Sequence, residues 1–379
     1  MPDLALPWTV RVNPHWAGAQ RAAGEWAREM GMVGGPGAVW TPGRFEAMRF
    51  AGWCAMAAPD AAPDRLELVA LWFTWALAVD DFFIAGYKAR DDLAGAGRFV
   101  EGLARFMPLP GGTAGGTAGG TAGGTAGGTA GGPRTGGHVE RGLADLWART
   151  VPLLPPGRRP ALREDVLRFA AGNLWEMAHS VRRRVPDPVD YLVRSRAAKG
   201  VSGLGARLMA LALGLEPPER LLAGRAAREL VNACADHVCL VNDIVSYSLE
   251  REVERHSNNG VVAVQDFLGC GLQQAVDVLG DQLATCLRVF ETLAAEEPAA
   301  GLGERDGPAY VRGLRDLMGG NLAWHLGNSR YVDLDHASVP LPPGPRRAVH
   351  DSAAPAPSEP STAGSSSGPF GTPSTTCAM

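Results

Sequence analysis

Apolar residues recur at intervals of three and four along most of this 379-residue chain, as in helices that bury one face. The breaks between these segments carry proline, as at Ala58-Pro59 and Pro155-Pro156, and proline stops helices. No convincing set of segments alternates between apolar and polar residues, and no GxGxxG or Walker-type loop occurs. We therefore expect an all-α fold with helices packed around a central space. The predicted helices are Arg44–Ala57, Arg65–Tyr87, Val139–Val151, Arg163–Arg184, Val189–Leu213, Ala227–Val253 and Gly271–Ala295.

Two segments depart from this pattern. The unit TAGG repeats five times within Gly111–Gly132, and glycine loses more conformational freedom on ordering than any other residue. We predict that residues 111–137 form a disordered insertion between two helices. From Val339 to Met379 the chain is rich in Pro, Ser, Gly and Ala, which predicts a disordered tail. The remainder, residues 1–338, is expected to form one helical domain.

Composition narrows the class of protein. Hydrophobic residues make up 46% of the chain and charged residues 20%, which suits a globular protein with a core. The net charge of −4 disfavours a nucleic-acid-binding protein. The six cysteines form no CxxC pair, so we expect reduced thiols in a cytoplasmic protein. No signal-peptide pattern opens the sequence, and the most apolar stretch, Leu68–Val79, falls short of the ~20 residues that span a bilayer.

The first candidate for chemistry is the pair Asp80-Asp81, which follows the apolar stretch LVALWFTWALAV. Two adjacent carboxylates at the end of a buried helix are costly unless cations accompany them. Carboxylate oxygens suit Mg²⁺, so the pair is a candidate metal site. The alternative is a helix end that emerges into water with both carboxylates solvated.

The second candidate is a stripe formed by Asn242, Ser246 and Glu250. On a helix, a spacing of four puts these residues on one face, ~6 Å apart along the axis. An amide, a hydroxyl and a carboxylate on one face offer three oxygen ligands to a cation. Polar residues at this spacing are also common on solvated helix faces.

The third candidate is cationic. Arg194 and Arg196 follow the turn VPDPVDY, and Arg330-Tyr331 follows a predicted helix near the end of the folded region. Arginine grips phosphate through two parallel hydrogen bonds, and Mg²⁺ bridges phosphate to carboxylate. Arginines together with two possible metal sites suggest a polyphosphate ligand, although a single arginine is more often a surface charge.

The order DD, R, NxxxSxxxE and RY resembles class I terpene synthases of the bacterial type. The resemblance covers almost the whole folded region and is closest to the two homologous domains of germacradienol/geosmin synthases. It rests on the stretches VERGLADLWARTVP, RVPDPVDYL, CLVNDIVSYSLE and the ending WH…SRY. It implies the all-α class I terpenoid synthase fold, a single helical bundle around an active-site cavity.

The resemblance also implies roles for the polar residues. Asp80 and Asp81 would be the aspartate-rich metal ligands, and Asn242, Ser246 and Glu250 would bind the remaining Mg²⁺, with three ions in all.

Further residues match the family's diphosphate-binding positions. Arg196 lies 46 residues before Asn242, which is the family's interval for the diphosphate sensor, and Lys199 and Gly200 match the linker and effector positions. Arg330 and Tyr331 match the C-terminal pair that contacts diphosphate.

Apolar residues around the first motif would shape the cavity. Looking back from Asp80 along its helix, Phe73, Ala76 and Leu77 lie nearest its face, and Phe73 and Trp324 are the aromatics that we expect to line the cavity.

The chain departs from its relatives at several positions. Ile84 and Ala85 stand where many relatives carry a third acid, and Leu249 stands where they usually carry Lys or Arg. Near relatives place Phe before the aspartates, where this chain has Ala76-Leu77-Ala78-Val79.

The reaction implied is Mg²⁺-dependent ionisation of farnesyl diphosphate. Cyclisation of the carbocation in a dry, apolar pocket then gives a sesquiterpene or sesquiterpene alcohol. Such an enzyme is a carbon–oxygen lyase. The alternatives are a diterpene synthase acting on geranylgeranyl diphosphate, a prenyl-chain-elongating transferase and a non-catalytic relative. We expect a prenyl diphosphate as the partner, no nucleic acid, no membrane span, and a monomer or homodimer.

Overall fold

The fold is built from helices. The computed structural model describes residue 4 and residues 6–109, 136–215, 224–253, 258–295 and 306–328. Over these residues an isolated bridge between Val33 and Trp40 is the one β-type pairing, so the all-α prediction is confirmed. The α-helices are α1 (Trp16–Glu29), α2 (Pro42–Met48), α3 (Phe50–Ala57), α4 (Pro63–Phe82), α5 (Leu93–Gly102), α6 (His138–Thr150), α7 (Arg159–Val181), α8 (Pro188–Ala198), α9 (Ala206–Ala212), α11 (Arg225–Ser248), α12 (Gly260–Leu268), α13 (Leu272–Ala295) and α14 (Asp306–Gly327).

Two predicted helices are each interrupted. The helix expected over Arg44–Ala57 is divided at Arg49, whose φ of 45° lies in the left-handed region. The helix expected over Val189–Leu213 breaks at Gly200, with φ of 69°. Because the apolar spacing continues across both breaks, the periodicity of the sequence predicts one continuous helix in each place.

Three helices, α1, α5 and α12, were not predicted from the sequence. Helices α1 and α5 are rich in Ala and Gly, and glycine is a poor helix former. The short helix α12, GVVAVQDFL, carries β-branched residues that read equally well as a strand. The predicted insertion is described only at residues 136 and 137, and the predicted tail lies outside the described residues.

Helix α4 is the central helix of the core. It contacts α1, α3, α6 and α9, and residues on all its faces, including Leu66, Trp72, Trp75 and Val79, are buried. Pro63–Arg90 is the one stretch in the described part of the chain long and apolar enough to cross a membrane. That stretch is longer than the apolar segment expected from sequence. Its most apolar window is 61% buried inside the fold, as expected of a core helix.

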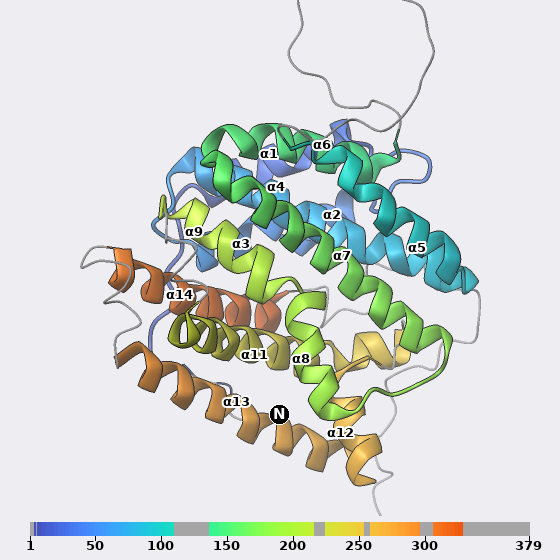
Figure 1. Ribbon diagram of the computed structural model, residues 1–379, viewed down its shortest axis with the longest axis vertical. Coiled ribbons are helices and arrows are strands. Elements are labelled where there is room, and N and C mark those ends of the chain that lie inside the picture. The colour runs from blue at the N-terminus through green and yellow to red at the C-terminus, as the bar shows by residue number, and fades with distance from the viewer. Residues whose placement is uncertain are drawn as a thin grey trace, which may run out of the picture. The chain divides into compact units, whose positions relative to one another are not determined.

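Helices α11 and α14, near the C-terminal end of the described chain, form part of the wall of an internal cavity. In Figure 1, α11 and α13 run alongside one another, and α14 packs against α11 and α3. A side chain at Gly320 would put its Cβ 2.6 Å from the backbone nitrogen of Ala57, so only glycine allows α14 and α3 this close. This approach brings Trp324 and His325 of α14 to the cavity wall.

Candidate active site

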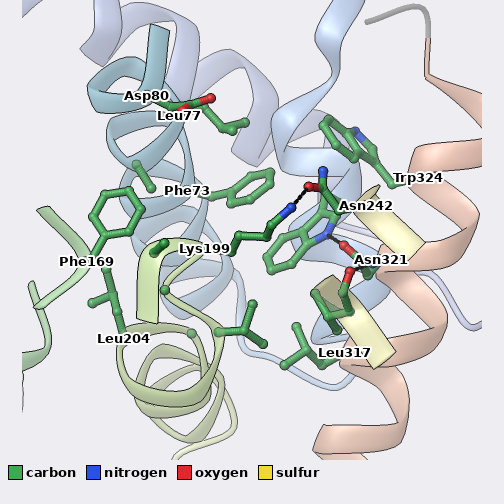
Figure 2. A pocket seen from close by; sticks show the side chains of 18 of the residues that line it. Phe73, Leu77, Asp80, Phe169, Lys199, Leu204, Asn242, Leu317, Asn321 and Trp324 are labelled. Carbon is green, nitrogen blue, oxygen red and sulfur yellow. Dashed lines mark hydrogen bonds between the residues drawn. The ribbon is translucent and has the colours of Figure 1, made fainter. Parts of the chain in front are cut away.

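A cavity of about 210 Å³ lies between α3, α4, α7, α9, α11 and α14. In the view of Figure 2, Asp80 lies at one end of it, and Leu204 and Leu317 lie at the other. Most of the wall is apolar. The polar side chains that line it include Asp80, Asn173, Glu176, Lys199, Asn242, Ser246, Glu250, Asn258, Asn321 and His325. An apolar chamber with a few acidic and amide groups can hold a hydrocarbon ligand that carries an anionic head with its cations.

Asp80 and Asp81 point in different directions. Asp80 lines the cavity at the end of α4, where the helix widens into a π-helical turn, η1 (Phe83–Tyr87). Asp81 is buried and does not line the cavity, and its Oδ2 accepts a hydrogen bond of 2.6 Å from Trp40 Nε1. Successive residues on a helix lie ~100° apart, so one neighbour of a cavity-facing residue faces the core. The expectation that both aspartates face one site is therefore corrected.

The stripe on α11 lies along the cavity as its spacing predicts. Asn242, Ser246 and Glu250 all line the cavity, and Ser246 Oγ donates a 2.6 Å hydrogen bond to Glu250 Oε1. Asn259 Nδ2 donates to the second oxygen, Glu250 Oε2, at 3.1 Å. The helix passes into another π-helical turn, η7 (Leu249–Val253), within this stripe, so Glu250 lies in that turn. Such turns are frequent at functional sites.

Lys199 joins this stripe from α8. Its Nζ donates to Asn242 Oδ1, as Figure 2 shows, and to Asp243 Oδ1 at 2.7 Å. Asp243 is fully buried, and Tyr191 Oη donates to the same Oδ1 at 2.7 Å. Burial lowers the pKa of Lys199, but the carboxylates of Asp243 and Glu250 outweigh it and hold the pKa above its usual value. The lysine is therefore charged at neutral pH.

Glu176 is a cavity residue that sequence reasoning missed. It lies on α7, and burial raises its pKa to about 8. The charge of Lys199 opposes that rise, and the carboxylates of Asp80 and Glu250 add to it. Glu176 lines the same cavity as Asp80 and Glu250. The available signal was the polar pair Asn173 and Glu176, three residues apart in an otherwise partly apolar helix.

Arg196 lies outside the cavity, contrary to expectation. Its Nε and a terminal nitrogen donate to the two carboxylate oxygens of Asp236 at 2.5 and 2.7 Å, and neither residue lines the cavity. The hydrogen bonds that Arg196 donates to Asp236 raise the pKa of the arginine. Gly200 lines the cavity at the helix break, where an added Cβ would meet the ring of Phe169 at 3.0 Å. Arg330 and Tyr331 lie outside the described residues.

Aromatic rings form part of the cavity wall. Phe73 stacks on Trp53 with ring centres 4.0 Å apart, and Trp324 meets Phe73 edge-on at 5.9 Å. Trp324 is fixed by a hydrogen bond of 3.1 Å from its Nε1 to the carbonyl of Met48. Rings held in this way present fixed faces and edges to a ligand.

The departures noted in the sequence also lie on this wall. Ala76 and Leu77 line the cavity next to Asp80, and so do Ile84 and Leu249. Ile84 is therefore an apolar cavity residue where the resemblance would place an acid, and Leu249 is one where it would place Lys or Arg.

The donor chemistry of the stripe suits a hard cation. Among the described residues no group of three His, Cys, Asp or Glu side chains is placed to hold a metal ion. The oxygens of Asn242, Ser246 and Glu250 nevertheless share one helix face at the cavity, and amide, hydroxyl and carboxylate oxygens are ligands that Mg²⁺ accepts. The residues fit such an ion in type, with Glu176 as a further carboxylate nearby.

Solved structures match the fold. The crystal structure of germacradien-4-ol synthase from Streptomyces citricolor superposes with a TM-score of 0.66 at 21% identity, covering 85% of this chain and 97% of that one. The architecture is thus that of the class I terpene synthases.

Sequence comparison places the chain within this class. The family model for terpene synthase family 2, C-terminal metal binding, matches residues 71–288, more than half of the chain, and the chain belongs to this family. Pristinol synthase from Streptomyces pristinaespiralis is 27% identical over 349 residues, covering 89% of this chain and 86% of that protein. Sesquiterpene synthase 1 from Postia placenta is 29% identical over 188 residues, covering 49% and 55% of the two. Enzymes of this family are lyases.

Proposed function

We propose that the protein ionises farnesyl diphosphate with the help of Mg²⁺ and cyclises the resulting carbocation to a sesquiterpene or sesquiterpene alcohol. The observation that carries this proposal is that Asp80 and the stripe of Asn242, Ser246 and Glu250 face one cavity from two helices. A relative described as a sesquiterpene synthase supports the fifteen-carbon substrate.

The polar residues would bind the diphosphate end of the substrate. Asp80 and the stripe would hold Mg²⁺, which would neutralise the charge that develops on the departing diphosphate. The resemblance implies three ions, with Asp81 as a further ligand. In this structure Asp81 would have to release Trp40 to take that part.

Cationic side chains would bind the diphosphate directly. Lys199 already lines the cavity, and Arg330 and Tyr331 are assigned by resemblance. Arg196 would contact the ligand only after leaving Asp236, so we propose that diphosphate binding competes for this arginine. Gly200 keeps the cavity wall open where any side chain would strike Phe169.

The apolar wall would control the carbocation. Phe73, Trp53 and Trp324 present π-surfaces that can stabilise a passing positive charge. Leu204, Leu317 and their neighbours exclude water from the folded prenyl chain.

A diterpene synthase is the second candidate, because Ala76 leaves space next to Asp80. The chain-elongating transferase would need a second aspartate-rich motif. The only acid at that point, Asp243, is buried behind the cavity wall and bonded to Tyr191 and Lys199.

The test is incubation of the purified protein with Mg²⁺ and farnesyl diphosphate, followed by mass spectrometry of the extract. Cyclic hydrocarbons or alcohols that disappear on adding EDTA would support the proposal. A longer diphosphate, formed when isopentenyl diphosphate is included, would identify the transferase. The absence of any product from either farnesyl or geranylgeranyl diphosphate would favour the non-catalytic relative.

A further inference from the structure

Glu250, the last residue of the stripe, lies beyond the regular part of its helix. Helix α11 ends at Ser248, and Glu250 follows in the π-helical turn η7. The 3.6-residue repeat that aligns Asn242 with Ser246 therefore does not by itself fix the place of this carboxylate. Its orientation at the cavity depends on further contacts.

Ser246 gives only part of that support from within the stripe. Its hydroxyl has a single hydrogen, and two acceptors lie 2.6 Å from Oγ, the carbonyl oxygen of Asn242 and Glu250 Oε1. Ser246 is also a ligand in the proposed metal site, so its oxygen would be engaged by the ion. A group outside the ligand set is better suited to orient Glu250.

Asn259 is such a group. It is buried, it does not line the cavity, and its Oδ1 caps helix α12 by accepting a 2.8 Å hydrogen bond from the backbone nitrogen of Val261. Its Nδ2 donates to Glu250 Oε2 at 3.1 Å and to the carbonyl oxygen of Asp243 at 2.8 Å, which uses both amide hydrogens. A flipped amide would set Nδ2 against the N–H of Val261 and Oδ1 against two acceptors. The observed orientation is therefore the one that satisfies every group.

The start of α12 is itself fixed against α11. Gly260 follows Asn259, and a Cβ there would lie 2.7 Å from Asp243 Oδ2 and 3.2 Å from Leu279 Cδ2. Asp243 is fully buried and accepts a hydrogen bond from Lys199. Asn259 thus belongs to a tightly packed part of the fold, and its amide ties Glu250 to that part.

We propose that Asn259 is a positioning residue of the metal site, which holds the Glu250 carboxylate in the orientation that binds the ion. This inference rests on the proposed function, because it takes Glu250 as a Mg²⁺ ligand. Asn259 acts through Glu250 and touches neither the ion nor the substrate. A carboxylate oxygen that accepts one hydrogen bond keeps a lone pair for a cation, and a ligand held in place before the ion arrives loses less freedom on binding.

The test measures metal affinity separately from chemistry. Asn259→Thr keeps an oxygen that can cap α12 and suits the extended backbone there, with φ of −144°, but it has no amide donor. Binding of Mn²⁺ is followed by the electron paramagnetic resonance signal of the free ion, with inorganic diphosphate present. The dissociation constant of the variant is expected to rise at least about tenfold, as is typical when a partner of a metal ligand is removed.

Turnover of farnesyl diphosphate gives a second, independent reading. The Mg²⁺ concentration for half-maximal rate should rise in Asn259→Thr by a factor similar to that for Mn²⁺ binding. At saturating Mg²⁺, kcat should return close to the wild-type value, because the chemistry uses groups that the substitution leaves in place.

A matched control changes another helix cap in the same way. Asp92 caps α5, where its side chain accepts a 2.8 Å hydrogen bond from the nitrogen of Gly95, and α5 does not line the cavity. Asp92→Thr should leave Mn²⁺ binding and the Mg²⁺ requirement unchanged. Should Asn259→Thr fail to fold, Asn259→Ser offers a smaller hydroxyl cap without the amide and should show the same loss of affinity. Thermal unfolding in metal-free buffer establishes that each variant is folded.

The outcomes separate the two proposals. Wild-type affinity for Mn²⁺ in the folded Asn259 variants would overturn the role of Asn259 and leave the metal-dependent function standing. A loss of kcat that saturating Mg²⁺ does not restore, with Mn²⁺ affinity unchanged, would mean a purely structural role and would overturn it as well. If the wild type itself binds no Mn²⁺ with diphosphate present, the metal site is wrong, and the inference falls with it.

Discussion

The side-chain oxygens of Asn242 and Glu250 lead to a prediction at the residue scale. Asn242→Ala and Glu250→Gln each remove an oxygen that faces the cavity, and each should lower kcat by more than about 100-fold, because even indirect partners of a metal typically contribute 10- to 100-fold. The measurement is steady-state turnover with farnesyl diphosphate and Mg²⁺.

Ser248→Ala is the control for this comparison, because Ser248 is exposed on the same helix. It should keep wild-type turnover. Wild-type activity in the Asn242 and Glu250 variants, or turnover unaffected by EDTA, would contradict the assignment of the stripe.

Glu176 leads to a prediction about stability and pH. Burial raises its pKa from the ordinary 4.5 to about 8, so between these values the folded protein holds a proton that the unfolded chain has released. The stability linked to this proton is complete below pH 4.5 and is lost as the pH rises through 8. In the absence of metal, the Tm of Glu176→Gln should therefore fall less than the Tm of the wild type when the pH is raised from 5 to 8.

Thermal unfolding in EDTA-containing buffers at the two pH values measures this difference. The exposed Glu101, changed to Gln, should retain the wild-type pH dependence. Identical slopes for the wild type and Glu176→Gln would mean that this carboxyl is not proton-bound in the folded state.

The site residues that could be predicted from sequence are those whose relation depends on one helix alone. The stripe of Asn242, Ser246 and Glu250 needed only the helical repeat. Glu176 and the Lys199–Asp243 pair join different helices, and their meeting depends on how α7, α8 and α11 pack. The direction of Asp81 likewise depends on Trp40, which lies 41 residues earlier.

At the scale of elements, the sequence located the long helices but not their interruptions. Three helices, α4, α8 and α11, each widen or break next to a candidate residue: after Asp80, at Lys199-Gly200 and after Ser246. Apolar periodicity averages over several turns, so a single irregular turn does not alter it. These irregular turns lie beside the residues that line the cavity, where they redirect side chains.

The contact between α14 and α3 gives a prediction at this scale. Gly320→Ala would place a Cβ 2.6 Å from the nitrogen of Ala57 and 2.7 Å from the carbonyl carbon of Met56. Backbone cannot move aside as a flexible side chain can, so the helices must separate, at a cost of about 1–3 kcal/mol typical of overpacking. Chemical denaturation should report this loss.

Gly327→Ala serves as the control on the same helix, because a Cβ there meets no atom within 4 Å. It should be neutral or slightly stabilising, since Ala favours helix over Gly. Equal stability for Gly320→Ala and the wild type would mean that α14 and α3 lie farther apart than the structure has them.

At the scale of the whole molecule, six helices together decide which substrate the cavity accepts. Ala76 and Leu77 lie on its wall next to Asp80, where the resemblance leads us to expect larger rings, so smaller side chains there would widen the cavity. Geranylgeranyl diphosphate has one isoprene unit more, about five carbons, each worth ~0.8 kcal/mol when buried, so a cavity that admits it would bind it readily.

Aromatic side chains on other walls of the cavity leave less room for this longer substrate. Trp53 stacks on Phe73, and Trp324 meets the same ring, so aromatic side chains from α3 and α14 occupy cavity space next to Phe73. We therefore predict that farnesyl diphosphate has the higher kcat/KM when both diphosphates compete in one reaction. A higher value for geranylgeranyl diphosphate would overturn this choice. In that event Ala76→Phe should restore the preference for fifteen carbons, whereas Ala226→Phe, at an exposed position of α11, should not.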